Sequence, residues 1–209
     1  MKFPSPVFGG TPIEAARAAI VLVHGRGGSA EDMMGLFAEL DVPGLAAVAA
    51  QAPGNTWYPN SFLAPLAANQ PFLDRSLAQI ESLVSDVISR GIAVEKLALL
   101  GFSQGACLSC EFVARNPRRF GAVMALTGGL IGPPGTPRNY PGSLDGTPVF
   151  LGAGDPDPHV PFVRVQESRD VLAAMGASVE MRRYPGMGHT INHDELDACR
   201  NLLLAVASE

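Results

Sequence analysis

Short aliphatic runs alternate along this chain with segments of helical periodicity, and this alternation limits its fold more than any other feature. The run at 18–23 is apolar at every position, which is typical of a parallel strand buried on both faces. In the segment 72–90, apolar residues instead recur every three or four positions, as on one face of a helix. Strands that alternate with helices predict an α/β fold, with a mostly parallel central sheet and helices on both faces.

The same patterns predict the order of elements, with glycine, proline and capping residues at their ends. The expected strands are 18–23, 45–51, 96–101, 120–126, 147–151 and 178–184, and the expected helices are 29–40, 72–90, 104–115, 161–175 and a last one capped by Asn192. The irregular stretch 128–146 is expected to be an ordered surface loop near the ligand site. In such folds that site lies at the carboxyl ends of the strands.

Length and composition limit the class of protein. A chain of 209 residues fits a single α/β domain spanning 1–209, and a hydrophobic share of 47% can fill its core. The net charge of −5 and the scattered basic residues argue against a nucleic-acid partner. No apolar run approaches the roughly 18 residues that cross a bilayer, so we expect no integral membrane segment.

The N-terminal segment and the cysteines bear on the cellular compartment. Prolines interrupt the segment 1–6 before the apolar core of a signal peptide could develop. The three cysteines are an odd number in a chain too large to need disulfides, which fits a reducing compartment. We therefore expect a cytoplasmic protein, and the sequence predicts no particular oligomeric state.

The segment Gly101-Phe102-Ser103-Gln104-Gly105 joins an expected strand to an expected helix. A serine hydroxyl is a weak nucleophile, so it must lie uncovered, beside a base and near donors that receive the developing oxyanion. In a Gly-x-Ser-x-Gly turn the glycines remove side chains that would collide, and the helix N-terminus favours negative charge on the substrate oxygen. The position of this motif predicts that Ser103 is a catalytic nucleophile.

A histidine base is expected late in the chain, because sites of this type run in the order Ser, acid, His. His189 meets that requirement, since it follows the last expected strand and precedes the last expected helix. His159, on the loop with the acid candidates, and His24, in the first glycine turn, are the alternatives. A structural hydrogen bond is the simpler interpretation of His24, and His193 is expected to be solvated.

Two aspartates, Asp155 and Asp157, follow the expected strand at 147–151 and are candidates for the acid. The acid accepts the Nδ1 proton of the histidine, which fixes the tautomer and stabilises the imidazolium. Spacing alone does not separate the two, and the other aspartate is expected to be a turn or capping carboxylate.

The oxyanion hole needs one backbone NH from the residue after the nucleophile and one from the first glycine turn. This requirement points to the amides of Gln104 and Arg26. The Arg26 side chain is expected either to line the entrance of the site or to be solvated.

Apolar residues near the expected site are candidates for an acyl pocket. Trp57, Phe62 and Met187 are expected to contact substrate, although aromatic and methionine side chains most often fill cores. Cys107 and Cys110 form a Cys-x-x-Cys, but without a second ligand pair they indicate buried packing. We expect neither a metal nor a cofactor.

Four segments, taken together, resemble the carboxylesterase and phospholipase family of α/β-hydrolases, which includes the acyl-protein thioesterases. They span nearly the whole chain in the family's order, and the resemblance implies an α/β-hydrolase fold. The family's pattern of Asp, Pro, any residue, Val and Pro falls on Asp157, so the resemblance implies that Asp157 is the acid. It also places the oxyanion amides on Arg26 and Gln104, although the family usually carries Leu where Arg26 stands. The segments are Leu22-Val23-His24-Gly25, Gly101-Phe102-Ser103-Gln104-Gly105-Ala106, Gly154-Asp155-Pro156-Asp157-Pro158-His159-Val160-Pro161 and Tyr184-Pro185-Gly186-Met187-Gly188-His189.

The resemblance implies hydrolysis of a small-molecule carboxylic ester, with thioesters and lysophospholipids as further substrates. Many relatives of this fold insert a helical cap after the strand corresponding to 120–126, where this chain has only 128–146. We therefore expect an open site and no large cap domain. The alternatives are a dienelactone-hydrolase-like enzyme, an acyltransferase that passes the acyl group to an alcohol, and a non-catalytic binding protein. The complete Ser, Asp and His set argues against the last.

Overall fold

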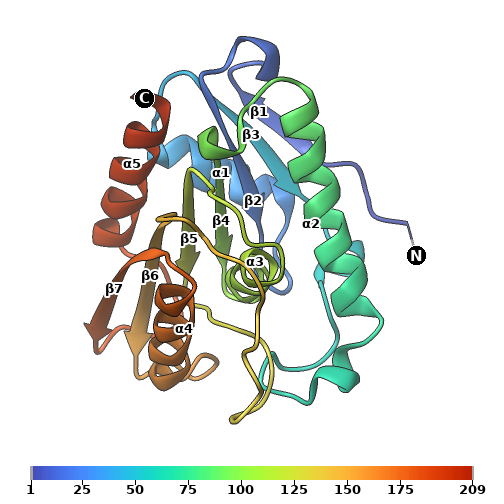
Figure 1. Cartoon of the computed structure of the whole chain (residues 1–209), viewed down its shortest axis with the longest axis vertical. Coiled ribbons are helices and arrows are strands. Elements are labelled where there is room, and N and C mark those ends of the chain that lie inside the picture. The colour runs from blue at the N-terminus through green and yellow to red at the C-terminus, as the bar shows by residue number, and fades with distance from the viewer. Residues whose placement is uncertain (1, 209) are drawn as a thin grey trace.

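Seven strands form one sheet in the computed structural model, which describes residues 2–208 (Figure 1). Their order is β1-β3-β2-β4-β5-β6-β7, in which β1 runs antiparallel to β3 and the other neighbours run parallel. The predicted mostly parallel sheet is confirmed. The strands are β1 Val7–Gly10, β2 Ala18–Val23, β3 Leu45–Ala50, β4 Leu97–Phe102, β5 Ala122–Leu126, β6 Pro148–Asp155 and β7 Ser178–Pro185.

The sequence does not predict the edge strand β1. Its four residues alternate between half-buried and exposed side chains, so they form no apolar run that would distinguish a strand from a loop. Two other strand bounds differ from the prediction by more than one residue. Strand β5 begins at Ala122, and β6 continues to Asp155, which places that aspartate within the strand.

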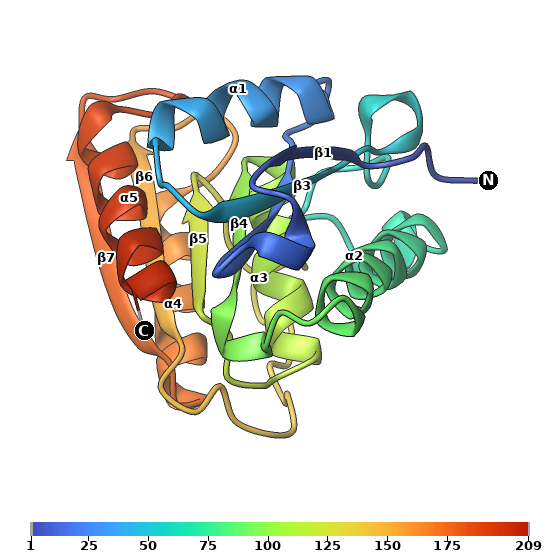
Figure 2. The same cartoon turned by 90° about the horizontal axis from the view of Figure 1, so that it is seen from above.

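Helices cover both faces of the sheet, as predicted (Figure 2). Helices α1 and α5 pack on one face, and α2, α3 and α4 pack on the other. Ser29 caps α1, because its hydroxyl accepts from the Asp32 amide at 3.1 Å while the Asp32 carboxylate accepts from the Ser29 amide at 2.8 Å. The helices are α1 Ala30–Leu40, α2 Phe72–Ser89, α3 Gln104–Arg115, α4 Phe162–Ala174 and α5 His193–Ser208.

Burial on both faces of the sheet explains the continuous apolar runs of its central strands. Along β2, Val21 and Val23 belong to the core that includes side chains of α2, α3 and α4. Ile20 and Leu22 belong to the core that includes side chains of α1 and α5. Successive side chains of a strand point to opposite faces, so each residue of β2 has a layer to pack against.

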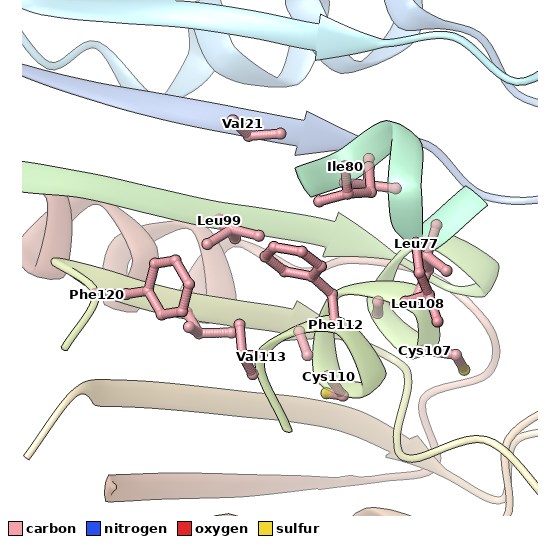
Figure 3. Close-up of a cluster of buried hydrophobic side chains, with 14 of the residues drawn as sticks. Val21, Leu77, Ile80, Leu99, Cys107, Leu108, Cys110, Phe112, Val113 and Phe120 are labelled. Carbon is pink, nitrogen blue, oxygen red and sulfur yellow. The ribbon is translucent and has the colours of Figure 1, made fainter. Parts of the chain in front are cut away.

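Replacement of Phe112 by alanine is expected to lower the free energy of unfolding by about 3–5 kcal/mol, because the buried ring would leave a cavity. Phe112 is fully buried, and Figure 3 shows it projecting from α3 in one cluster with Leu99 and Ile80. Phe8, which is 52% exposed, gives a matched control, and Phe8→Ala should cost less than about 1 kcal/mol. Chemical denaturation measures both losses, and equal losses would contradict this description of the core.

The carboxyl ends of the parallel strands lie at one edge of the sheet and carry the predicted site residues. The turn after β2, the junction of β4 and α3, the loop after β6 and the loop after β7 meet there. Between β5 and β6 the chain forms no helix, and the amide of Gly132 in this segment donates to the Phe62 carbonyl at 2.7 Å. The predicted absence of a helical cap in this segment is therefore confirmed.

Candidate active site

Ser103 occupies a strained turn between β4 and α3. Its φ of 54° and ψ of −116° are rare for a residue with a side chain. A Cβ on Gly105 would overlap the main-chain oxygen of Val23, and one on Gly101 would overlap the carbonyl of Gly105. Both glycines are therefore required by close packing of the helix start against the neighbouring strand, which holds Ser103 at the edge of the sheet.

Hydrogen bonds connect Ser103, His189 and Asp157 in one chain. The Nε2 atom of His189 lies 2.8 Å from Ser103 Oγ, and its Nδ1 atom lies 2.8 Å from Asp157 Oδ2. A carboxylate only accepts, so Nδ1 carries the proton and Nε2 is free to accept from the serine hydroxyl. The Asp157 side chain is fully buried and that of His189 is 19% exposed, so only the histidine end of this pair meets solvent.

The Asp157 carboxylate is held in its ionised form. Burial alone would raise its pKa, but hydrogen bonds from the amides of Val160 and His159 and from His189 outweigh that effect and lower the pKa below the ordinary value. The two amides donate to Oδ1 at 2.9 and 2.7 Å, which leaves Oδ2 for His189. The negative charge therefore faces the imidazole ring throughout the neutral pH range.

The structure separates the two candidate aspartates by their partners. Asp155 forms an ion pair with Arg183 at the sheet edge, whereas Asp157 contacts His189. His159 is exposed, and the centre of its ring lies 4.8 Å from that of His189 in an edge-to-face arrangement. The geometry thus brings Asp157 and His189 to Ser103 and leaves Asp155 and His159 outside the hydrogen-bonded chain.

His24 has the structural role that its place in the glycine turn suggests. It is buried, its Nε2 accepts from the Ala52 amide at 3.1 Å, and its Nδ1 donates to the Gly25 carbonyl at 2.6 Å. Burial lowers the pKa of His24 and thereby favours the neutral ring that these two bonds require. This histidine therefore fixes the turn after β2.

The amides of Arg26 and Gln104 border the nucleophile from two elements. A Cβ on Gly25 would lie 3.3 Å from Ser103 Cβ, so the turn that carries Arg26 runs directly beside the serine. Within residues 2–208 neither amide donates a hydrogen bond to a protein acceptor. Gln104 is also the first residue of α3, where the helix dipole favours an anion. Both groups are available to a substrate oxygen.

The side chains of the same two residues hold the segment Trp57–Asn60. Gln104 accepts from the Trp57 amide at 3.0 Å and donates to the Tyr58 carbonyl at 2.8 Å. The Arg26 guanidinium donates to the carbonyls of Tyr58, Pro59 and Asn60 at 3.0, 3.0 and 2.7 Å. Long-range bonds of this kind leave no trace in local sequence patterns, so the sequence does not predict this anchoring role.

A cleft of about 420 Å³ opens beside Ser103. Of the three apolar residues expected to contact substrate, Phe62 lines this cleft, but Trp57 and Met187 do not. Trp57 is buried with its indole NH donating to the His24 carbonyl at 2.8 Å, and the Met187 sulfur accepts from Asn192. Both side chains support neighbouring loops instead of contacting the cleft. The lining residues are Arg26, Tyr58, Pro59, Asn60, Ser61, Phe62, Ser103, Gln104, Cys107, His159, Val160 and His189.

The cysteines of α3 are buried thiols. Burial raises the pKa of Cys107 to about 12 and raises that of Cys110 further, so neither is a thiolate at neutral pH. Within residues 2–208 no three His, Cys, Asp or Glu side chains are grouped as metal ligands would be. Cys107 is thus a neutral wall residue of the cleft.

Comparison with known proteins gives the family. Residues 10–206 match the Phospholipase/Carboxylesterase family. The chain belongs to this family. The sheet order and the serine turn agree with this membership, and the predicted α/β-hydrolase fold is confirmed.

Solved structures and curated proteins similar to this chain agree with its assignment to the family. It is 45% identical to a phospholipase/carboxylesterase from Dyadobacter fermentans, with a TM-score of 0.92 over 96% of both chains. It is 27% identical to a probable carboxylesterase, SOBER1-like, from Arabidopsis thaliana over 87% of this chain and 76% of that one. It is 31% identical to acyl-protein thioesterase 1 from Neurospora crassa over 61% of this chain and 53% of that protein, about half of its length.

No helix among residues 2–208 is both long and apolar enough to cross a membrane.

Helix α5, which follows the His189 loop, carries a buried carboxyl group in its first turn. Glu195 is fully buried, and its Oε2 accepts from the Asn192 amide at 3.0 Å, while Oε1 has no hydrogen-bond partner among residues 2–208. Burial raises the pKa of Glu195 to about 7.

Glu195→Gln is therefore expected to stabilise the protein at pH about 8, by about 1–3 kcal/mol, and to have little effect near pH about 5. The folded protein binds the Glu195 proton more tightly than the unfolded chain, whose ordinary pKa is 4.5, so this stability is lost as the pH rises through about 7. Denaturation curves at both pH values measure the difference, with the exposed Glu39→Gln as the control. A gain that is the same at both pH values would contradict the assigned pKa.

Proposed function

We propose that this protein hydrolyses small carboxylic esters through an acyl-enzyme formed on Ser103. The observation that carries the proposal is the chain of two 2.8 Å hydrogen bonds from Ser103 through His189 to Asp157 at the floor of the cleft. Each group has the protonation state that its role needs. The nucleophile faces an unprotonated nitrogen, and the opposite ring nitrogen faces a carboxylate.

The first half of the reaction forms the acyl-enzyme. His189 Nε2 removes the proton from Ser103 Oγ as Oγ attacks the ester carbonyl carbon. The carbonyl oxygen becomes an oxyanion and accepts hydrogen bonds from the amides of Arg26 and Gln104. The bond to the alcohol oxygen then breaks, and His189 transfers its proton to that oxygen. The negative charge of Asp157 stabilises the imidazolium in between.

The second half releases the acid. A water molecule enters the position that the alcohol left and gives a proton to His189 as its oxygen attacks the acyl carbon. The same two amides hold the second oxyanion. When the tetrahedral intermediate collapses, the bond to Ser103 Oγ breaks and Oγ recovers its proton from His189. The enzyme returns to its starting state without a cofactor in any step.

The cleft favours acyl groups of short to medium length. Its volume of about 420 Å³ lies in the lower part of the range for small-molecule sites. Phe62 and Val160 provide apolar contacts, and the carbonyls of Tyr58 to Asn60 are tied to Arg26. Thioesters and lysophospholipids are further candidates, because the same attack and the same oxyanion donors serve them.

A series of p-nitrophenyl esters with increasing acyl length tests this proposal. We expect hydrolysis to be fastest for short and medium chains and to fall for long ones. Competing alcohols in the same assay distinguish hydrolysis from acyl transfer, since a transferase would form new esters in place of the free acid. If none of the esters in the series released p-nitrophenol, the proposed activity would be overturned.

A further inference from the structure

The Arg26 guanidinium is a fixed positive charge at the wall of the cleft. Its Nη1 and Nη2 atoms donate to three main-chain carbonyls, which hold the group in place but carry no net charge. Within the described residues it has no carboxylate at ion-pair distance. No hydrogen bond to a protein acceptor is made by its Nε atom in that part of the chain. The cation is therefore positioned and not neutralised.

The remaining lining of the cleft gives this charge no acidic counterpart. Its titratable groups besides Arg26 are the imidazoles of His159 and His189 and the neutral Tyr58 and Cys107. The side chain of Asp157 is fully buried, and its Oδ2 atom faces His189. The protein as a whole has a net charge of −5, whereas the residues that line the cleft include the cation of Arg26 and no Asp or Glu. Local charge of this kind concentrates ligands of the opposite sign.

We infer that Arg26 makes this enzyme selective for esters whose acyl or alcohol part bears a carboxylate. This inference rests on the proposed function. The guanidinium is already ordered by its three carbonyl partners, so a substrate carboxylate gains a charge-assisted hydrogen bond without ordering a flexible side chain. Because Arg26 is exposed, solvent weakens the attraction, and the expected preference is about five- to twentyfold in kcat/KM.

Two matched substrate pairs test this selectivity. In the first pair the acyl part varies: the p-nitrophenyl ester of glutaric acid has its second carboxyl group either free or methylated. In the second pair the alcohol part varies: p-acetoxybenzoic acid is compared with its methyl ester. The ratio of kcat/KM within each pair is measured for the wild type, Arg26→Gln and Arg26→Lys. If a substitution loosens the segment Trp57–Asn60, kcat/KM falls for both members of a pair, and the effect cancels in the ratio. Loss of the positive charge lowers kcat/KM only for the charged member.

The wild type should favour the charged member about five- to twentyfold more than Arg26→Gln does, in one pair or in both. The pair that responds identifies which part of the substrate carries the carboxylate. Arg26→Lys should keep most of the preference, and high salt should reduce it in the wild type. Equal ratios for wild type and Arg26→Gln in both pairs overturn the selectivity but leave the esterase activity standing. No turnover of any of the four substrates overturns both.

Discussion

Ser103→Ala is expected to lower kcat/KM for a p-nitrophenyl ester by about 10⁴- to 10⁶-fold. The variant loses the atom that forms the acyl-enzyme, while the oxyanion amides and the cleft remain and supply the residual rate. Alanine differs from serine by one oxygen, so the turn between β4 and α3 should keep its shape. Steady-state assays of purified protein measure the loss, and circular dichroism verifies the fold.

Ser109→Ala is the matched control for this loss. Ser109 lies on the same helix, α3, and its buried hydroxyl has no hydrogen-bond partner in the part of the chain that the structure describes. Removal of that oxygen should leave kcat/KM within about threefold of the wild-type value, because it acts on no reacting atom. A Ser103→Ala enzyme that kept more than about a tenth of the wild-type kcat/KM would contradict the mechanism.

Asp157→Asn is expected to lower kcat by about 10⁴-fold, because it reverses the tautomer of His189. The amides of His159 and Val160 donate to Oδ1, so the asparagine carbonyl keeps that position and its NH₂ group faces the histidine. An NH₂ group donates, which places the ring proton on Nε2. That nitrogen could then no longer accept the proton of Ser103.

Asp155→Asn provides the comparison, since the two aspartates differ by two positions and by their partners. Asp155 pairs with Arg183, whose side chain is 59% exposed. Loss of this ion pair in Asp155→Asn should change kcat less than about fivefold. The pH profile adds a second criterion. Asp157 has a lowered pKa, so the activity of the wild type should not fall through titration of this group in the neutral range. A larger loss in Asp155→Asn than in Asp157→Asn would contradict the assignment.

Much of the fold follows from local patterns in the sequence. The continuous apolar run of β2 and the helical spacing of α2 each depend on neighbours within a few positions, so periodicity alone predicts them. The serine turn is equally local, because Gly101 and Gly105 are required by contacts at the same junction of strand and helix. Strand β1 is not predictable in this way, since its pairing with β3 depends on residues about forty positions away.

The candidate site likewise contains some residues that local sequence patterns predict and others that they do not. Motifs and chain order predict Ser103 and His189. They do not distinguish Asp157 from Asp155, for which the family resemblance favours Asp157 and the structure shows its hydrogen bond to His189. Local sequence patterns do not predict which residues line the cleft. Trp57 is predicted as a substrate contact but lies in the core, and the anchoring of Tyr58 by Arg26 joins residues 32 positions apart.

Labelling with a fluorophosphonate tests the central claim most directly, because this reagent reacts with a serine that an adjacent base activates. Peptide mass spectrometry of the labelled protein identifies the modified residue. The mechanism predicts one adduct, on Ser103, that is absent from Ser103→Ala and forms much more slowly in His189→Ala. An adduct on Cys107, or labelling of Ser103→Ala to the wild-type extent, would show that another residue is the nucleophile.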